Sequence, residues 1–254
     1  MELDLITFLI VCPLVFLAGF IDSIAGGGGL VSLPAYMIAG LPAHNAIATN
    51  KLSSSMGTTV STIRLSLAGQ IPWKEAWVYV LCAIGGSTLG AHLALMVPER
   101  SFKIVMLVVI PLTALYLILY KPTAKEKEAL PRRQTVLRAG IIALLIGMYD
   151  GFYGPGTGTF LILLLTSLAH YKLGQANGIT KAINLSSNLT ALVVYVLNGR
   201  VIWLLGLAAG ICNMLGNYLG ISVFQKKGSR IVTPIMLTVL GIFFVRLLVE
   251  LFLT

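Results

Sequence analysis

A succession of long apolar runs, separated by short polar loops, is the feature that most limits what this 254-residue chain can fold into. The runs cover about residues 5–22, 29–41, 44–68, 74–97, 101–120, 136–150, 157–169, 178–198, 201–225 and 231–252. A helix that crosses a bilayer needs roughly 20 apolar residues, so the chain has room for about ten such segments. Only 11% of the residues are charged, which is too few for a soluble domain. We therefore predict an all-α, multi-pass protein of the cell membrane.

One polar stretch, residues 121–138, divides the chain in two and carries the basic residues Lys121, Lys125, Lys127, Arg132, Arg133 and Arg138. We assign residues 1–120 to a first transmembrane repeat, 121–135 to a basic cytoplasmic linker and 136–254 to a second transmembrane repeat. Together they form a single transport domain. Basic loops favour the cytoplasmic side of a membrane. The formal net charge of +9 therefore indicates orientation in the bilayer and no nucleic-acid partner.

The cysteines and histidines are scattered singly along the chain, at Cys12, Cys82, Cys212, His44, His92 and His170. Zinc sites, haem attachment and disulfide frameworks need closely spaced ligands or paired cysteines. We expect no metal and no cofactor.

The two halves of the chain resemble each other. The motif that ends in Asp22 matches the motif that ends in Asp150 at an offset of 128 residues. After a two-residue insertion the offset becomes 130, and it pairs Lys51 with Lys181, Gly69 with Gly199, Trp73 with Trp203, Cys82 with Cys212, Gly86 with Gly216, Gly90 with Gly220 and Arg100 with Arg230. So many rare residues at one shared offset indicate a duplicated unit.

An odd number of segments in each half predicts two repeats of inverted topology. With the linker in the cytoplasm, the loop at Lys226–Arg230 is also cytoplasmic and both termini are external. In the alternative arrangement, the short segments 29–41 and 157–169 re-enter the membrane without crossing it. The repeats are then parallel and the Lys226–Arg230 loop is external, so we favour the inverted arrangement.

Each short segment follows a glycine cluster, namely Gly26, Gly27, Gly28 and Gly29 in the first half and Gly154, Gly156 and Thr157 in the second. Non-helical backbone at membrane depth is tolerated where it lines a cavity. A half-helix that begins there points its positive end at an anion, as in transporters with broken helices. The alternative is that the glycines only permit close helix packing.

Two lysines lie inside duplicated polar helices. Lys51 is accompanied by Asn50 and Ser54, and Lys181 by Asn184 and Asn188 on one helix face. A lysine in a membrane helix is costly unless it is paired or hydrated, so it marks a functional site by default. We predict an anion path along these residues. The alternative is that each lysine extends to a nearby membrane interface.

Asp22 and Asp150 are carboxylates in apolar surroundings, each directly before a glycine cluster. They either cap the following turn or pair with the lysines. Alternatively, one or both bind a coupling proton, as carboxylates within membranes can.

The string GFIDSIAGGGGLVSLP, followed by ATNKLSSSMGT, resembles the TauE/SafE family of sulfite exporters. The second-half strings GMYDGFYGPGTGTFL and NGITKAINLSSN resemble the same repeated pattern. The resemblance implies a polytopic transporter of sulfur-containing anions, with the lysine and glycine motifs in the substrate region. One departure is that Pro155 and Thr157 stand where the first cluster has glycines, so the two half-sites are not expected to be equivalent.

We therefore expect a secondary transporter of a small sulfur-containing anion, such as sulfite, thiosulfate, sulfoacetate or another organosulfonate. No ATP-binding GxxxxGK[ST] motif is present, so an ion gradient or the anion's own gradient must supply the energy. The alternative is an intramembrane enzyme that acts on a lipid or quinone.

Overall fold

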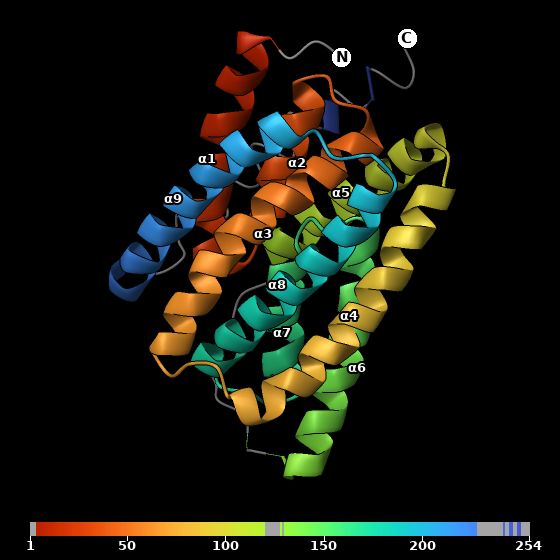
Figure 1. Cartoon of the computed structure of the whole chain (residues 1–254). Helices are drawn as coiled ribbons and strands as arrows, with labels where there is room; N and C mark the ends of the chain where they lie inside the picture. Colours follow the sequence, from red (N-terminus) through yellow and green to blue (C-terminus); the bar gives the residue numbers. More distant parts are fainter. Residues whose placement is uncertain are drawn as a thin grey trace.

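The computed structural model describes residues 4–119, 128 and 130–227, with 241, 244–245 and 248–249. In these residues the fold is all-helical, as predicted (Figure 1). The helices are α1 (Leu5–Ala25), α2 (Gly29–Ile38), α3 (Ala43–Leu67), α4 (Trp73–Met96), α5 (Glu99–Leu119), α6 (Arg132–Phe152), α7 (Thr157–Ser167), α8 (Leu173–Leu197) and α9 (Trp203–Lys227). Most of the predicted linker, the Lys226–Arg230 loop beyond residue 227 and nearly all of the predicted segment 231–252 lie outside the described residues.

Four of the described helices, α1, α4, α6 and α9, are both long and apolar enough to cross a membrane. Large apolar side chains such as Leu81 on α4, Leu145 on α6 and Leu215 on α9 are exposed on their outer faces. Such exposure is expected when lipid surrounds the protein, and the protein is therefore a multi-pass membrane protein.

Helices α3 and α8 are the polar centre of the molecule. Each has 25 residues, and most of their serine, threonine, asparagine and lysine side chains are buried. They pack against each other, and α9 and α4 cover them. Polar side chains enclosed in this way need partners inside the protein.

The glycine clusters end the preceding helices. Gly26 follows α1 in the left-handed conformation, with φ +72°, and Gly154 and Gly156 have φ +96° and +84° after α6. Side chains with a Cβ are strained in that conformation. The chain then turns back into α2 and α7, which have 10 and 11 residues. At 1.5 Å per residue each is about half as long as a bilayer core is thick.

Corresponding helices pack in corresponding ways. α1 packs mainly on α9, while its counterpart α6 packs mainly on α4. A Cβ atom added at Gly86 would lie 2.1 Å from the Leu144 carbonyl oxygen, and one at Gly216 would lie 2.1 Å from that of Phe16. Leu144 and Phe16 are 128 residues apart, so the two close helix contacts are duplicates of each other. Close approach through small residues is typical of membrane helices.

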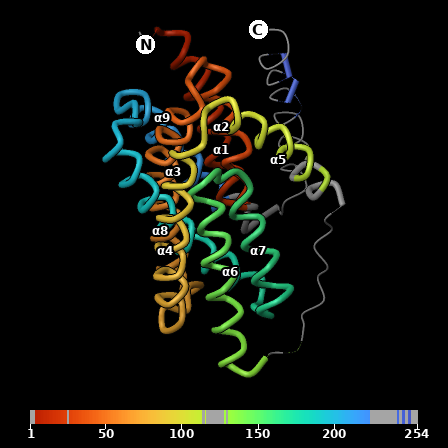
Figure 2. The backbone as a smooth tube through the Cα atoms, turned by 90° about the vertical axis from the view of Figure 1, so that its right-hand side faces the viewer, coloured from red at the N-terminus to blue at the C-terminus, as the bar shows by residue number. Residues whose placement is uncertain are grey.

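The counterpart helices run in opposite directions. In Figure 1, α1 and α3 descend from the top of the view, whereas α6 and α8 rise from the bottom. Figure 2 shows α7 lying beside α6 and returning toward its start. Opposite directions of the two halves are expected for an inverted repeat. The inverted topology in the membrane stays a prediction.

Candidate functional site

The starts of α2 and α7 meet in the interior of the molecule. The Thr159 amide donates a hydrogen bond to the Gly26 carbonyl, with N and O 3.2 Å apart. A Cβ atom at Gly26 would lie 2.5 Å from the carbonyl carbon of Gly158, and one at Gly158 would lie 2.4 Å from the Gly26 oxygen. Only glycine lets two loops approach so closely. The positive ends of both helix dipoles therefore point into one region.

A narrow polar cavity of about 30 Å³ lies at this meeting point. Its lining includes the predicted residues Asp22, Gly26, Gly28, Gly29, Asn50, Lys51, Ser54, Asp150, Gly154, Thr157, Asn184 and Asn188. Among the other predicted residues, Gly27 and Gly156 belong to the same loops but are not part of this lining. Lys181 lies directly behind the lining, where it contacts Asp22.

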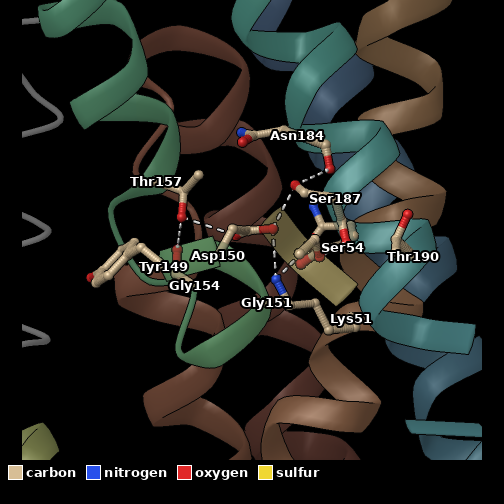
Figure 3. A network of polar contacts seen from close by, with 12 residues as sticks. Lys51, Ser54, Tyr149, Asp150, Gly151, Gly154, Thr157, Asn184, Ser187 and Thr190 are labelled. Atoms are coloured by element: carbon tan, nitrogen blue, oxygen red, sulfur yellow. Dashed lines mark hydrogen bonds and ion pairs between the residues drawn. The ribbon is translucent and has the colours of Figure 1, made fainter. Parts of the chain in front are cut away.

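The Lys51 ammonium is held by the other half of the chain. Its Nζ lies 2.8 Å from Asp150 Oδ2 and donates to Asn188 Oδ1 at 2.9 Å (Figure 3). Asp150 also accepts from Thr157 Oγ1 at 2.9 Å and from Ser187 Oγ at 2.6 Å. The side chains of Lys51 and Asp150 are only 2% and 4% exposed. Asp150 is therefore held in place by one lysine and two hydroxyl donors.

The Lys181 ammonium makes the reciprocal contact. Its Nζ lies 2.7 Å from Asp22 Oδ2 and donates to the Asp22 carbonyl oxygen at 2.5 Å. Each lysine therefore pairs with the aspartate of the opposite half. The alternative in which the lysines extend to a membrane interface is wrong, because both are buried at an ion pair.

The two ion pairs differ in what else surrounds the carboxylate. At the positions that duplicate Thr157 and Ser187, the first half has Gly29 and Gly57. Asp22 therefore receives neither hydroxyl, and its side chain is 16% exposed. With fewer charge-assisted hydrogen bonds to fix it, the Asp22 side chain is easier to separate from its lysine than Asp150 is.

The glycines of the loops also make room for the ion pairs. A Cβ atom at Gly154 would lie 3.2 Å from Lys51 Nζ and 3.3 Å from Asp150 Oδ1. A Cβ atom at Gly28 would lie 2.6 Å from the Cβ of Asp22. Packing and site geometry are thus both reasons for the glycine clusters.

Sequence reasoning missed Asn213, which lines the cavity from α9. The Asn217 amide donates to Asn213 Oδ1 at 2.7 Å, and Ser61 on α3 donates to Asn217. Two amides four residues apart share one helix face. That spacing within an apolar helix was the signal that could have revealed them.

One lining side chain has an unused hydrogen-bonding atom. Asn184 is 5% exposed, and its Oδ1 has no hydrogen-bond partner within the described residues. Buried amides are normally paired, and because Oδ1 is an acceptor its natural partner is a hydrogen-bond donor such as water. The described residues contain no group of three or more His, Cys, Asp or Glu that could hold a metal ion.

Comparison with known proteins agrees with the sequence resemblance. The family described as "Sulfite exporter TauE/SafE" matches residues 11–247. "Probable membrane transporter protein ORF9" of Sinorhizobium sp is 36% identical over 97% of this chain and 93% of its own length. "Probable membrane transporter protein YfcA" of Escherichia coli (strain K12) is 32% identical over 92% of this chain and 87% of its own length. No solved structure matches.

A third relative, a "Probable membrane transporter protein" of Haemophilus influenzae, is 30% identical over 87% of this chain and 86% of its own length. The family and these three relatives are described as exporters or transporters, so the intramembrane enzyme is the weaker of the two functions considered.

Proposed function

Because this chain belongs to the TauE/SafE family of membrane transporters, we propose that it carries a small sulfur-containing anion across the cell membrane. The protein is a transporter and not an enzyme. The proposed substrates are sulfite, thiosulfate, sulfoacetate or another organosulfonate. The driving force is an ion gradient or the gradient of the anion itself, and protons are the proposed coupling partner.

The observation that carries this proposal is the pair of crossed ion pairs at the meeting point of two half-helices. Lys51 and Lys181 bring two positive charges to the cavity region, and both half-helices direct a positive dipole end toward it. An ion pair serves structure alone in many proteins. Two duplicated pairs beside half-helix ends instead favour an anion site.

The charge balance of the site suggests how substrate and proton are linked. The two lysines are neutralised by the two aspartates, so an anion gains little attraction while both pairs are intact. If one carboxylate takes a proton, its lysine is freed and the site becomes cationic. Anion binding and protonation then favour each other, which is the thermodynamic requirement for coupled transport.

Asp22 is the better candidate for this proton. It has the Lys181 ion pair but neither of the hydroxyl donors that hold the other carboxylate, and it is the more exposed of the two. Asp150 then keeps its charge and anchors Lys51 throughout the cycle.

Alternating access would follow from relative movement of the two halves. Each ion pair joins one half to the other, and the α2 and α7 loops touch at Gly26 and Gly158. Rearrangement of these contacts would open the cavity to one side and then to the other, as proposed for transporters built from repeats.

A charge-balanced double substitution tests the role of Lys51. Replacing one partner alone strands a buried charge and costs about 3–5 kcal/mol, so loss of function would be ambiguous. We expect Lys51→Met with Asp150→Asn to reach the membrane in normal amounts but to transport the anion at least about tenfold more slowly, because one interaction with the anion is lost. Uptake of radiolabelled sulfite or thiosulfate into vesicles measures this.

The matched control removes the Lys103–Glu99 ion pair, which lies outside the cavity lining and has N and O 3.5 Å apart. Lys103→Met with Glu99→Gln should transport normally. Normal transport by the Lys51 and Asp150 double variant would show that its ion pair has only a structural role and would overturn the proposal.

The identity of the anion can be tested by thermal unfolding of the purified protein. A ligand at 100 times its Kd stabilises the folded state by about 2.7 kcal/mol. We expect sulfite, thiosulfate or a sulfonate to raise Tm more than sulfate or a simple carboxylate does. Stabilisation by carboxylates alone would contradict a sulfur-containing substrate.

A further inference from the structure

A second hollow lies on the outer surface between α4 and α6, which run side by side (Figures 1 and 2). We call it the α4–α6 groove. It has a volume of about 890 Å³, and its lining includes Lys74, Trp77, Arg133, Leu137, Gly140 and Ile141. Most of its wall is apolar, and Trp77, Leu137 and Ile141 are about half exposed or more. These two helices are long and apolar enough to cross a membrane, so we expect the groove to face lipid.

Positive charge is concentrated at one end of the groove, where both helices begin. Lys74, Arg132 and Arg133 lie there with Glu75 as the single acid of the lining. Glu75 is already engaged, because Arg132 Nε donates to it at 2.9 Å and the Tyr171 hydroxyl donates to it at 2.7 Å. No partner within the described part of the chain neutralises Lys74 or Arg133, and both are exposed.

The equivalent pair of helices, α9 and α1, lacks this charge. At the positions that correspond to Lys74, Arg132 and Arg133, the other half of the chain has Leu204, Asp4 and Leu5. Packing of the repeat therefore does not require the basic residues. Of the two equivalent helix pairs, only α4 and α6 carry these basic residues, at the end of the groove where both helices begin.

We propose that the α4–α6 groove binds an anionic phospholipid. The phosphate lies against Lys74 and Arg133, and an acyl chain follows the apolar wall past Trp77, Leu137 and Ile141. Basic pockets between membrane helices recognise phospholipid headgroups in this way, and tryptophan prefers the level of the headgroups. This inference is independent of the anion that the protein transports.

Lipid-dependent stability tests the proposal. Purified protein in detergent is titrated with dioleoyl phosphatidylglycerol or with dioleoyl phosphatidylcholine, which has the same chains and no net charge, and Tm is followed. We expect phosphatidylglycerol to raise Tm at lower concentration. Because each basic residue near an anionic headgroup contributes about fivefold to binding, Lys74→Gln with Arg133→Gln should weaken that response roughly 30-fold.

Two further variants separate a defined site from general attraction of a basic protein. Arg100→Gln, in the first turn of α5, with Arg200→Gln, in the loop before α9, removes the same charge outside the groove and should leave the response intact. Gly140→Leu fills the groove without changing charge, since its Cβ would meet only Cys82 Sγ, at 3.7 Å. It should abolish the preference for phosphatidylglycerol. Equal responses to the two lipids in the wild-type protein, or an unchanged response in the Lys74 and Arg133 variant, would overturn the proposal.

Discussion

At the scale of single residues, the two aspartates show how duplicated positions acquire different chemistry. Each carboxylate faces a buried lysine at under 3 Å. Asp150 has two hydroxyl donors in addition, whereas the first half has glycines at the equivalent sequence positions. The stronger network fixes the position of Asp150, and the weaker one makes Asp22 the candidate for the proposed coupling proton.

Replacing Asp22 by Asn imitates its protonated form. If this carboxyl binds the coupling proton, wild-type transport should increase as pH falls, because protonation frees Lys181 for the anion. The Asp22→Asn variant, compared at equal abundance in the membrane, should transport the anion with little dependence on pH. The pH profile of uptake into vesicles measures this. An unchanged profile in Asp22→Asn would assign this aspartate a purely structural role.

Ser187 should stabilise the folded state through its hydrogen bond to Asp150. A hydrogen bond to a charged group contributes about 1.5–3 kcal/mol, so Ser187→Ala should lose about that much unfolding free energy. The matched control is Ser186→Ala, whose hydroxyl donates to the Ile183 carbonyl within the same helix. It should change stability by less than about 0.5 kcal/mol. Similar losses in both variants, measured by denaturant titration, would argue against a special role for Ser187.

At the scale of helices, the meeting of α2 and α7 places the site. A methyl group at Gly158 would collide with the Gly26 carbonyl, and backbone cannot move aside as a flexible side chain can. We expect Gly158→Ala to lower unfolding free energy by about 1–3 kcal/mol and to reduce transport. Gly174→Ala is the control, because nothing lies within 4 Å of that Cβ position. Thermal unfolding and uptake measured together test this, and normal behaviour of Gly158→Ala would show that the loops separate easily.

The sequence predicts much of this element-level arrangement because length and glycine content are local properties. Segments 29–41 and 157–169 are too short to cross a bilayer, and each follows glycines, so short helices at Gly29 and Thr157 are expected from chemistry alone. The crossing of the ion pairs was not predictable in the same way. A repeat offset identifies which positions correspond, but not which helix each packs against. The role of Asn213 on α9 depends on the same tertiary packing.

At the scale of the whole molecule, contacts between loops indicate which loops lie on the same side of the membrane. Glu75 binds Arg132 and Tyr171, which brings the loops before α4, α6 and α8 to one end. At the other end, the Asn45 amide donates to the Arg200 carbonyl. The inverted arrangement predicts this distribution. The re-entrant, parallel alternative instead places the loop before α8 on the side opposite the linker.

Thiol labelling tests this topology. In a variant without the native cysteines, a single cysteine is introduced as Lys172→Cys or Arg200→Cys, both at exposed positions. With a cytoplasmic linker, an impermeant maleimide should label position 200 in intact cells and label position 172 only after the membrane is opened. The reverse pattern would contradict the inverted arrangement.

The crossed ion pairs also determine when the protein can finish folding. A ribosome delivers the first half to the bilayer before α6 and α8 exist, so the final partners of Asp22 and Lys51 are then still unsynthesised. The first half therefore cannot reach its native charge pairing by itself, however stable its helices are. Insertion proceeds from the N-terminus, but the centre of the molecule is completed only when the second half arrives.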